Sequence, residues 1–148
     1  MKKENQLKGK TIVITGVSSG FGRGVTIKLT QLGANVVGVA RRGEVLDALR
    51  LQIDGEEGTF IPIVGDVSNP ETIELLATAA KNKFGGIDIW INNVGVGALG
   101  YFWEIPIEDH ARLIDVNLKG LVYGSHAAMT YFVAKGELLN EHESNCVI

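Results

Sequence analysis

The feature that most constrains the fold of this chain is a short apolar run that leads directly into a glycine-rich turn. Residues 11–24 read TIVITGVSSGFGRG, in which TIVIT (11–15) has the pattern of a buried strand and helical spacing begins near residue 20. Gly16 lets the chain turn off the strand, Gly20 lets backbone approach a pyrophosphate, and Gly22 allows close packing of helix on strand. The free N–H groups at the start of the helix then face the phosphates. The segment predicts a phosphate-binding loop.

Predicted strands and helices alternate along the rest of the chain. Further strands are expected at 35–40, 59–65 and 87–92, and SNCVI (144–148) begins a fifth. Helices are expected at 20–32, around 45–53, from Pro70 to about 84, and from about 107 to 135. Pro62 places the third strand at an edge, and the unbroken IDIWIN favours a central fourth strand. We therefore expect an α/β fold, a doubly wound parallel sheet of the Rossmann type in a single domain, cut off within the fifth strand.

Two helices carry apolar residues at helical spacing, and in the longer one the spacing predicts which side faces the core. In the long helix at 107–135, one stripe repeats at about 3.6 residues and is expected to face the core: Ile107, Ala111, Ile114, Leu118, Leu121, Ser125, Met129 and Phe132. Beside it lies a row of small residues, Gly120, Gly124 and Ala128, which lets a partner subunit approach. In the helix at 20–32, the expected apolar positions are Phe21, Val25, Ile27, Leu29 and Leu32, with Gly33 at the C-cap.

Composition narrows the possible partners and the compartment. The 148 residues carry a formal charge of −3, so no basic field favours nucleic acid or an anionic membrane. No uncharged apolar run approaches the ~20 residues of a membrane span. The one cysteine, Cys146, forms no internal disulfide framework, and we expect a cytoplasmic protein. The histidines, at positions 110, 126 and 142, show no metal-binding spacing with it.

Four ordered motifs give the chain a specific family resemblance. TGVSSGFG (15–22), GDVS (65–68), NNVG (92–95) and DVNLKG (115–120) resemble the signatures of the short-chain dehydrogenase/reductase family, with Val94 in place of the usual alanine. The resemblance implies that the glycine-rich segment binds a nicotinamide dinucleotide through Thr15, Gly16, Ser18, Ser19, Gly20, Phe21 and Gly22. It also implies that Asp66, with the Val67 N–H, contacts adenine, and that Asn93 and Gly95 line the cofactor side of the site. From the residues alone, a second role for Asp66 is a helix N-cap, and both roles can hold together.

The end of the second strand indicates which nicotinamide cofactor is bound. An acidic residue there, about 20 residues beyond the glycines, accepts hydrogen bonds from the free ribose of NAD. This chain has Ala40, followed by Arg41 and Arg42, whose guanidinium groups can hold a 2′-phosphate, and Ser18 can add a hydroxyl donor. We expect NADP rather than NAD. The alternative is that both arginines belong to a solvated turn.

The catalytic residues that the resemblance implies are mostly absent. Members of the family use a serine, a YxxxK pair and a helix asparagine in general acid–base catalysis. Asn117 matches the asparagine. The sequence YFVAK, Tyr131 to Lys135, matches YxxxK, but it precedes the fifth strand instead of following a serine on it, and we expect no catalytic role. Tyr101, Phe102 and Trp103 either cap a substrate pocket or pack onto the body of the protein.

Three functions remain open on the sequence. The first is the cofactor-binding portion of an NADP-preferring oxidoreductase acting on an alcohol or carbonyl compound, inactive and marginally stable by itself. The second is a non-catalytic dinucleotide-binding or dimerising module. The third, ranked last, is a complete enzyme that uses Tyr131 and Lys135. The resemblance implies a homodimer or homotetramer formed through the helix at 107–135.

Overall fold

The computed structural model describes residues 6–136. Its first seven elements alternate, in the order β1 (Thr11–Thr15), α1 (Gly20–Gln31), β2 (Asn35–Ala40), α2 (Gly43–Ile53), β3 (Thr59–Val64), α3 (Pro70–Phe84) and β4 (Ile89–Ile91). A long helical segment follows, made of α4 (Ile107–Leu113), the π-helical stretch η1 (Ile114–Lys119) and α5 (Gly120–Lys135). The alternation predicted from the sequence is confirmed. The single helix expected at 107–135 contains the π-helical stretch, which the apolar spacing did not predict.

The four described strands form one parallel sheet in the order β3-β2-β1-β4. The edge position predicted for β3 from Pro62 is confirmed. The predicted fifth strand lies outside the described residues, and β4 is the outer strand of the described sheet on the side opposite β3. Because the chain runs outward from β1 to β3 and then returns to pair β4 with β1, the strand order reverses between β1 and β4. Open α/β sheets bind ligands at the carboxyl ends of strands beside such a reversal.

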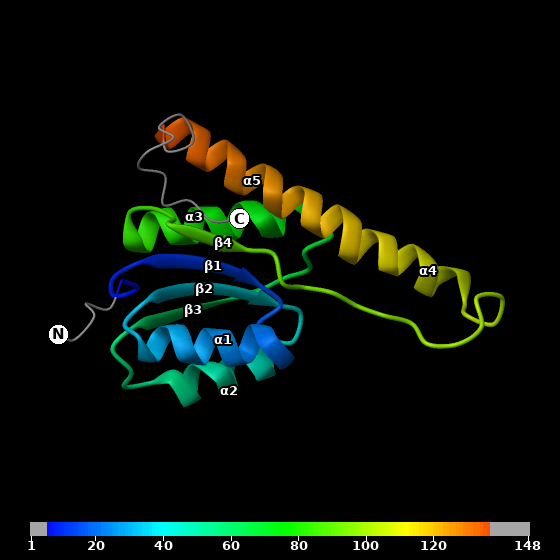
Figure 1. Ribbon diagram of the computed structural model, residues 1–148. Helices are drawn as coiled ribbons and strands as arrows, with labels where there is room; N and C mark the ends of the chain where they lie inside the picture. The colour runs from blue at the N-terminus through cyan, green and yellow to red at the C-terminus, as the bar shows by residue number, and fades with distance from the viewer. Residues whose placement is uncertain (1–5, 137–148) are drawn as a thin grey trace.

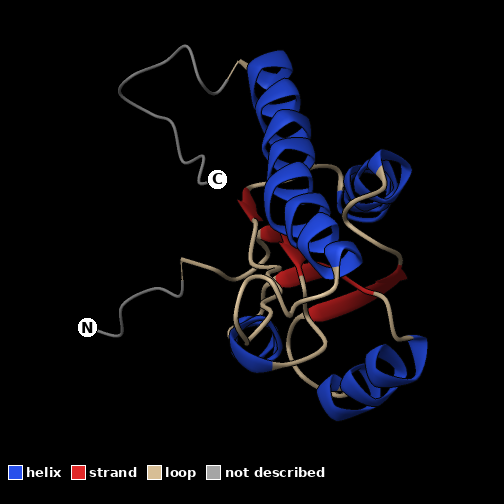
Figure 2. Ribbon diagram, turned by 90° about the vertical axis from the view of Figure 1, so that its right-hand side faces the viewer, coloured by secondary structure: helices blue, strands red, loops and turns tan. Residues whose placement is uncertain are grey.

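Helices cover both faces of the sheet, with α1 and α2 on one side and α3 and α5 on the other (Figure 1; Figure 2). The alternating side chains of β1 separate two cores. Ile12 and Ile14 pack with residues of α2 such as Leu46, whereas Val13 packs with Leu76 of α3 and Phe132 of α5. This two-layered burial is what fixes the doubly wound arrangement.

The buried face of α5 differs from the one predicted by the apolar spacing. Gly120, Gly124 and Ala128 are buried, together with Phe132 at the end of the helix. The rest of the predicted core stripe is exposed or half-buried, and Leu118 is 57% exposed. The reason is space: a Cβ at Gly120 would lie 2.8 Å from a methyl carbon of Val67, so only small residues let α5 approach the body. The prediction that the large apolar stripe faces the core was wrong.

In α1 small and polar residues are the most buried, and Ile27 and Leu29 pack partly against the core. Gly22, Thr26 and Thr30 are its buried residues, whereas Phe21, predicted as a cofactor residue, is 88% exposed. Thr26 Oγ1 donates to the Gly22 carbonyl at 2.7 Å, so the inward hydroxyl is satisfied within the helix. The helix end predicted at Gly33 is confirmed. Gly33 has a left-handed φ of 78° just beyond α1, as expected of a residue that ends a helix.

The β4–α4 loop and α4 form an arm that extends away from the sheet (Figure 1). None of the residues of α4 is buried. Near the tip of the arm, the rings of Tyr101 and Trp103 stack with centroids 5.0 Å apart, and Phe102 contacts His110. All three loop aromatics are exposed, so the expectation that they pack onto the body was wrong.

No helix in residues 6–136 has the length and apolar character needed to cross a membrane.

Candidate functional site

The glycine-rich turn joins β1 to α1 in a form that leaves the helix end available. Gly16 has a φ of 78°, which favours glycine, and a Cβ at Gly22 would overlap the Gly16 carbonyl oxygen. The N-cap residue Ser19 makes no side-chain capping bond, and the first turn of α1 contains no acidic residue. The free N–H groups and the positive end of the helix dipole are therefore available to an anion.

A cavity of about 390 Å³ opens at the carboxyl end of the sheet, in front of this turn. It is within the size range of small-molecule sites. The cavity brings together most of the predicted cofactor residues: Gly16, Ser18, Ser19, Gly20, Phe21, Arg41, Arg42, Asp66, Val67, Asn93 and Gly95. The sequence prediction missed other lining residues: Val39, Val96, Arg112 and Val116.

Thr15 and Gly22, also predicted as cofactor residues, do not line the cavity. Thr15 is buried, and its Oγ1 accepts hydrogen bonds from the N–H groups of Asn93, at 3.0 Å, and Val94, at 3.2 Å. Asn93 Nδ2 in turn donates to the carbonyl oxygens of Thr15 and Gly16, each at 3.1 Å. These bonds tie the ends of β1 and β4 together, and they hold the turn against the switch point of the sheet.

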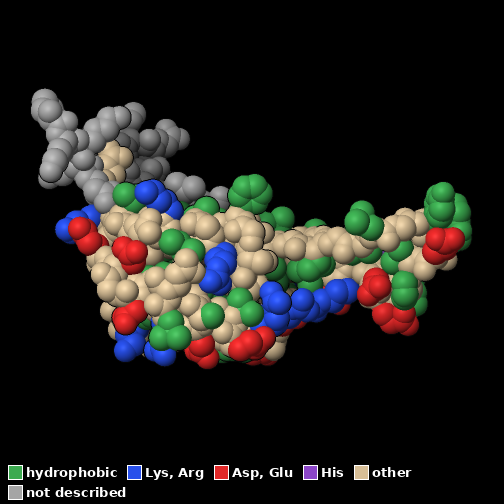
Figure 3. Space-filling model, turned by 90° about the horizontal axis from the view of Figure 1, so that it is seen from below, with side chains coloured by type: hydrophobic (Ala, Val, Ile, Leu, Met, Phe, Trp, Pro, Cys, Tyr) green, Lys and Arg blue, Asp and Glu red, His purple; other side chains and the backbone are tan. Residues whose placement is uncertain are grey.

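Two cations stand at the end of β2. Arg41 and Arg42 line the cavity and are exposed, and within residues 6–136 neither guanidinium has a hydrogen-bonding or ion-pairing partner. Ala40 before them is buried, at 7% exposure, and supplies no carboxylate. Figure 3 shows Lys and Arg side chains gathered where the arm meets the body. The mouth of the cavity is thus positively charged.

Asp66 lies across the cavity, in the β3–α3 turn. Its Oδ1 accepts from Ser68 N at 3.0 Å and Ser68 Oγ at 2.7 Å, and its Oδ2 accepts from Arg112 Nη2 at 2.7 Å. Burial by itself raises the pKa of this carboxyl, but the Ser68 donors and the Arg112 guanidinium outweigh it and hold the pKa below 3.8. Asn69, which accepts from Glu71 N, caps α3, so the reading of Asp66 as the N-cap was wrong.

Asn117 lies in η1, and its side chain is tied to the β4–α4 loop. Its Oδ1 accepts from Val96 N and its Nδ2 donates to Val96 O, both at 2.8 Å. This reciprocal pair uses both ends of the amide. Asn117 therefore anchors the loop that lines the cavity but is not itself a lining residue.

The YxxxK match lies at the opposite end of the sheet. Tyr131 Oη accepts a hydrogen bond at 3.0 Å from the N–H of Ile87, which precedes β4. Lys81 Nζ lies 5.0 Å, and Lys135 Nζ 5.8 Å, from the centre of its ring. The glycine turn follows the carboxyl end of β1, and β1 and β4 are parallel, so the phenol and the cavity are separated by the length of the strands.

Arg112 is the functional candidate that sequence reasoning overlooked. It lies in α4 among charged residues, and no local pattern distinguishes it from a solvated position. Only the path of the arm brings it over the β3–α3 turn. In residues 6–136, no three His, Cys, Asp or Glu side chains are grouped so that they could hold a metal ion.

The parallel sheet, its reversal beside β1 and the glycine turn at the carboxyl edge define the class of Rossmann-type dinucleotide folds. The family model described as "short chain dehydrogenase" matches residues 10–140. The chain belongs to the short-chain dehydrogenase/reductase family, a family of oxidoreductases that bind NAD or NADP.

Curated relatives and solved structures agree with this assignment. An uncharacterized oxidoreductase, YxnA, of Bacillus subtilis is 35% identical over 134 residues, which are 90% of this chain and 38% of the relative. A 3beta-hydroxysteroid dehydrogenase of Eggerthella lenta is 37% identical over 131 residues, 87% of this chain and 50% of the relative. A short-chain dehydrogenase/reductase structure from Mycobacterium marinum superposes with a TM-score of 0.82 at 31% identity, covering 89% of this chain and 53% of that one. The chain thus spans about half of these proteins or less.

Proposed function

We propose that this chain is the NADP(H)-binding portion of a short-chain oxidoreductase that transfers hydride between nicotinamide and an alcohol or carbonyl substrate. The observation that carries the proposal is the convergence of three features on one cavity. They are a helix N-terminus without a side-chain cap, two arginines that have no partner within residues 6–136, and a hydrogen-bonded carboxylate. Each of these groups meets a different requirement of a dinucleotide, namely its pyrophosphate, its ribose phosphate and its base.

The residues present fit such a cofactor. The N–H groups at the start of α1 would bind the pyrophosphate, and Arg41 and Arg42 would bind the 2′-phosphate. Val67 and Val116, both buried, offer an apolar surface to the adenine beside Asp66. The bound nicotinamide would supply or accept the hydride. Asn117 would act from its place in η1, where it fixes the loop beside the cavity through Val96.

The preference for NADP is tested by titrating the purified chain with NADPH and NADH. We expect tighter binding of NADPH. In the variant Arg41→Asp, the added carboxylate would repel the 2′-phosphate and lower the NADPH affinity more than the NADH affinity. Arg50→Asp, at an exposed site that does not line this cavity, is the matched control and should leave both unchanged. Equal affinities in the unmodified chain would contradict the assignment.

The described residues support cofactor binding without turnover. The hydroxyl oxygen of Tyr131 accepts a hydrogen bond from the Ile87 N–H at the end of the sheet opposite the cavity. We therefore propose that Tyr131 is not the catalytic acid. The alternative is a non-catalytic module that functions at this length. A screen of alcohols and ketones with NADP(H) should give no turnover in either case. A sharp, cooperative melt of a monodisperse sample would favour the module, because within residues 6–136 no strand pairs with the outer edge of β4, and an uncovered apolar edge promotes association.

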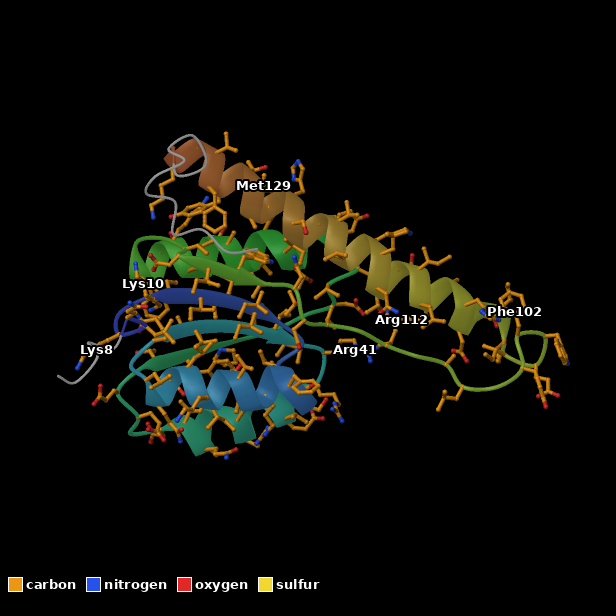
Figure 4. All side chains as sticks on the ribbon, viewed as in Figure 1. Lys8, Lys10, Arg41, Phe102, Arg112 and Met129 are labelled. Atoms are coloured by element: carbon orange, nitrogen blue, oxygen red, sulfur yellow. The ribbon has the colours of Figure 1, made fainter. Side chains whose placement is uncertain are left out.

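We also propose that the arm and α5 mediate self-association, with the faces reversed from the sequence prediction. The small residues of α5 pack inward, and the large apolar side chains are left exposed: Ile107, Ile114, Leu118, Leu121, Val122, Met129 and Val133. Their spacing along the helix forms a continuous seam. A second copy of the chain, packed antiparallel, would cover it. Figure 4 shows Met129 on the outer side of α5, away from the sheet.

A further inference from the structure

Arg112 is the cation of the cavity that comes from the arm instead of the sheet edge. Its side chain crosses from α4 to the β3–α3 turn and donates to Asp66 Oδ2 at 2.7 Å. The side chains are 34% and 30% exposed, so the pair is partly shielded from water. In Figure 4, Arg112 reaches from the inner end of α4 toward the region of Arg41.

This ion pair fastens the arm to the rim of the cavity. Within the described residues, the other side-chain hydrogen bond made by α4, from His110 to the Phe102 carbonyl, stays inside the arm. Since α4 buries none of its residues, Arg112 is its polar link to the α/β body. The ion pair with Asp66 therefore joins α4 to the rim of the cavity, beside the Asn117 anchor of the β4–α4 loop.

The hydrogen bonds of Asp66 are unevenly shared between its two oxygens. Oδ1 accepts two bonds from Ser68, which fills its usual capacity, whereas Oδ2 accepts one from Arg112. Oδ2 therefore retains one acceptor position. Arg112 also fixes the rotation of the carboxylate through its bond to Oδ2.

We propose that Arg112 is a positioning residue that selects adenine at the base end of the dinucleotide. It holds Asp66 so that Oδ2 accepts a hydrogen bond from the exocyclic amino group of the base. This inference rests on the proposed dinucleotide function and adds to it. Arg41 and Arg42 would distinguish NADP from NAD, and Arg112 with Asp66 would distinguish adenine from a base without the amino group.

The test compares NADPH with its deaminated analogue, reduced nicotinamide hypoxanthine dinucleotide phosphate, by isothermal titration calorimetry on the 148-residue chain. The unmodified chain should bind NADPH more tightly. In Arg112→Met, NADPH affinity should fall about tenfold, since a charge-assisted hydrogen bond is misplaced, while affinity for the analogue changes little. Lys119→Met, which removes the exposed ion pair with Asp115 from the same helical segment, is the matched control and should keep the preference.

The outcomes separate this inference from the proposed function. If Arg112→Met lowers the affinity for both ligands equally, Arg112 only fastens the arm and the inference is overturned. An unmodified chain that binds both ligands equally would also overturn it, while leaving dinucleotide binding intact. A chain that binds neither ligand would overturn the proposed function and the inference together. If Arg112→Met does not fold, Arg112→Lys, which keeps the charge and loses the planar fork, is judged by the same criterion.

Discussion

Asn92 Oδ1 occupies the space that a side chain at Gly124 would need. A Cβ placed on Gly124 would overlap this oxygen, which accepts a hydrogen bond at 3.0 Å from the indole N–H of the fully buried Trp90. Asn92 Nδ2 also donates to Ser125 Oγ at 3.2 Å. The contact between α5 and β4 is therefore both tight and polar, and it determines which face of the helix is buried.

Gly124→Ala is expected to destabilise the protein by about 1–3 kcal/mol, because the added methyl group displaces Asn92 and its hydrogen bonds. Gly24→Ala is the matched control. Gly24 is an exposed position in α1 with nothing within 4 Å of its added Cβ, so the same change should stabilise by about 0.5–1 kcal/mol through helix propensity. Urea unfolding of both variants measures the two effects. A neutral Gly124→Ala would contradict the close approach.

This contact also explains why the sequence predicted the elements well and the helix faces poorly. Strand and helix positions follow from the local apolar period, and the order of elements follows from their alternation. The orientation of a helix depends on how closely it approaches its neighbour. In α5, glycine and alanine face the core, while larger residues such as Leu121 and Met129 face outward. A prediction that places the larger apolar side chains in the core therefore selects the exposed face of α5.

The exposed face leads to a prediction about self-association. Leu118→Glu places a charge in the middle of the apolar seam, and it should convert the proposed dimer to monomer as measured by light scattering. Leu51→Glu is the control, since Leu51 is 72% exposed on α2, remote from the seam. An unmodified chain that is monomeric at high concentration would contradict the proposal. If the Leu118→Glu variant is still a dimer, the interface lies on another surface of the chain.

The pH dependence of stability should report on Asp66. Its pKa is held below 3.8 in the folded chain by Ser68 and Arg112 against the opposing effect of burial. A lowered pKa means that the carboxylate stabilises the fold fully above pH 3.8, and that this contribution is lost as the pH falls through the folded-state pKa. Asp66→Asn should therefore be less stable than the unmodified chain at neutral pH, with the difference shrinking in acid. A difference in the free energy of unfolding that does not change with pH would contradict this.

The candidate site was predictable to the extent that its residues belong to contiguous motifs. The glycine turn, the arginine pair after β2 and Asp66 each lie at the carboxyl end of a strand, where the fold class places ligands, and all of them meet at one cavity. Arg112 comes from α4, which is separated from the sheet by a long loop. Its distance from Asp66 depends on the direction of the arm, and no sequence period encodes that direction.

The environment of Tyr131 gives a prediction that separates a structural from a catalytic phenol. Tyr131→Phe removes the acceptor for the Ile87 N–H and should destabilise the protein by about 1 kcal/mol. Because the hydroxyl lies at the end of the sheet opposite the cavity, NADPH affinity should not change. His126→Gln, an exposed substitution on the same helix, is the control for both measurements. If an extended version of the chain shows turnover, Tyr131→Phe should preserve it. Loss of turnover with unchanged stability would instead assign the phenol to catalysis.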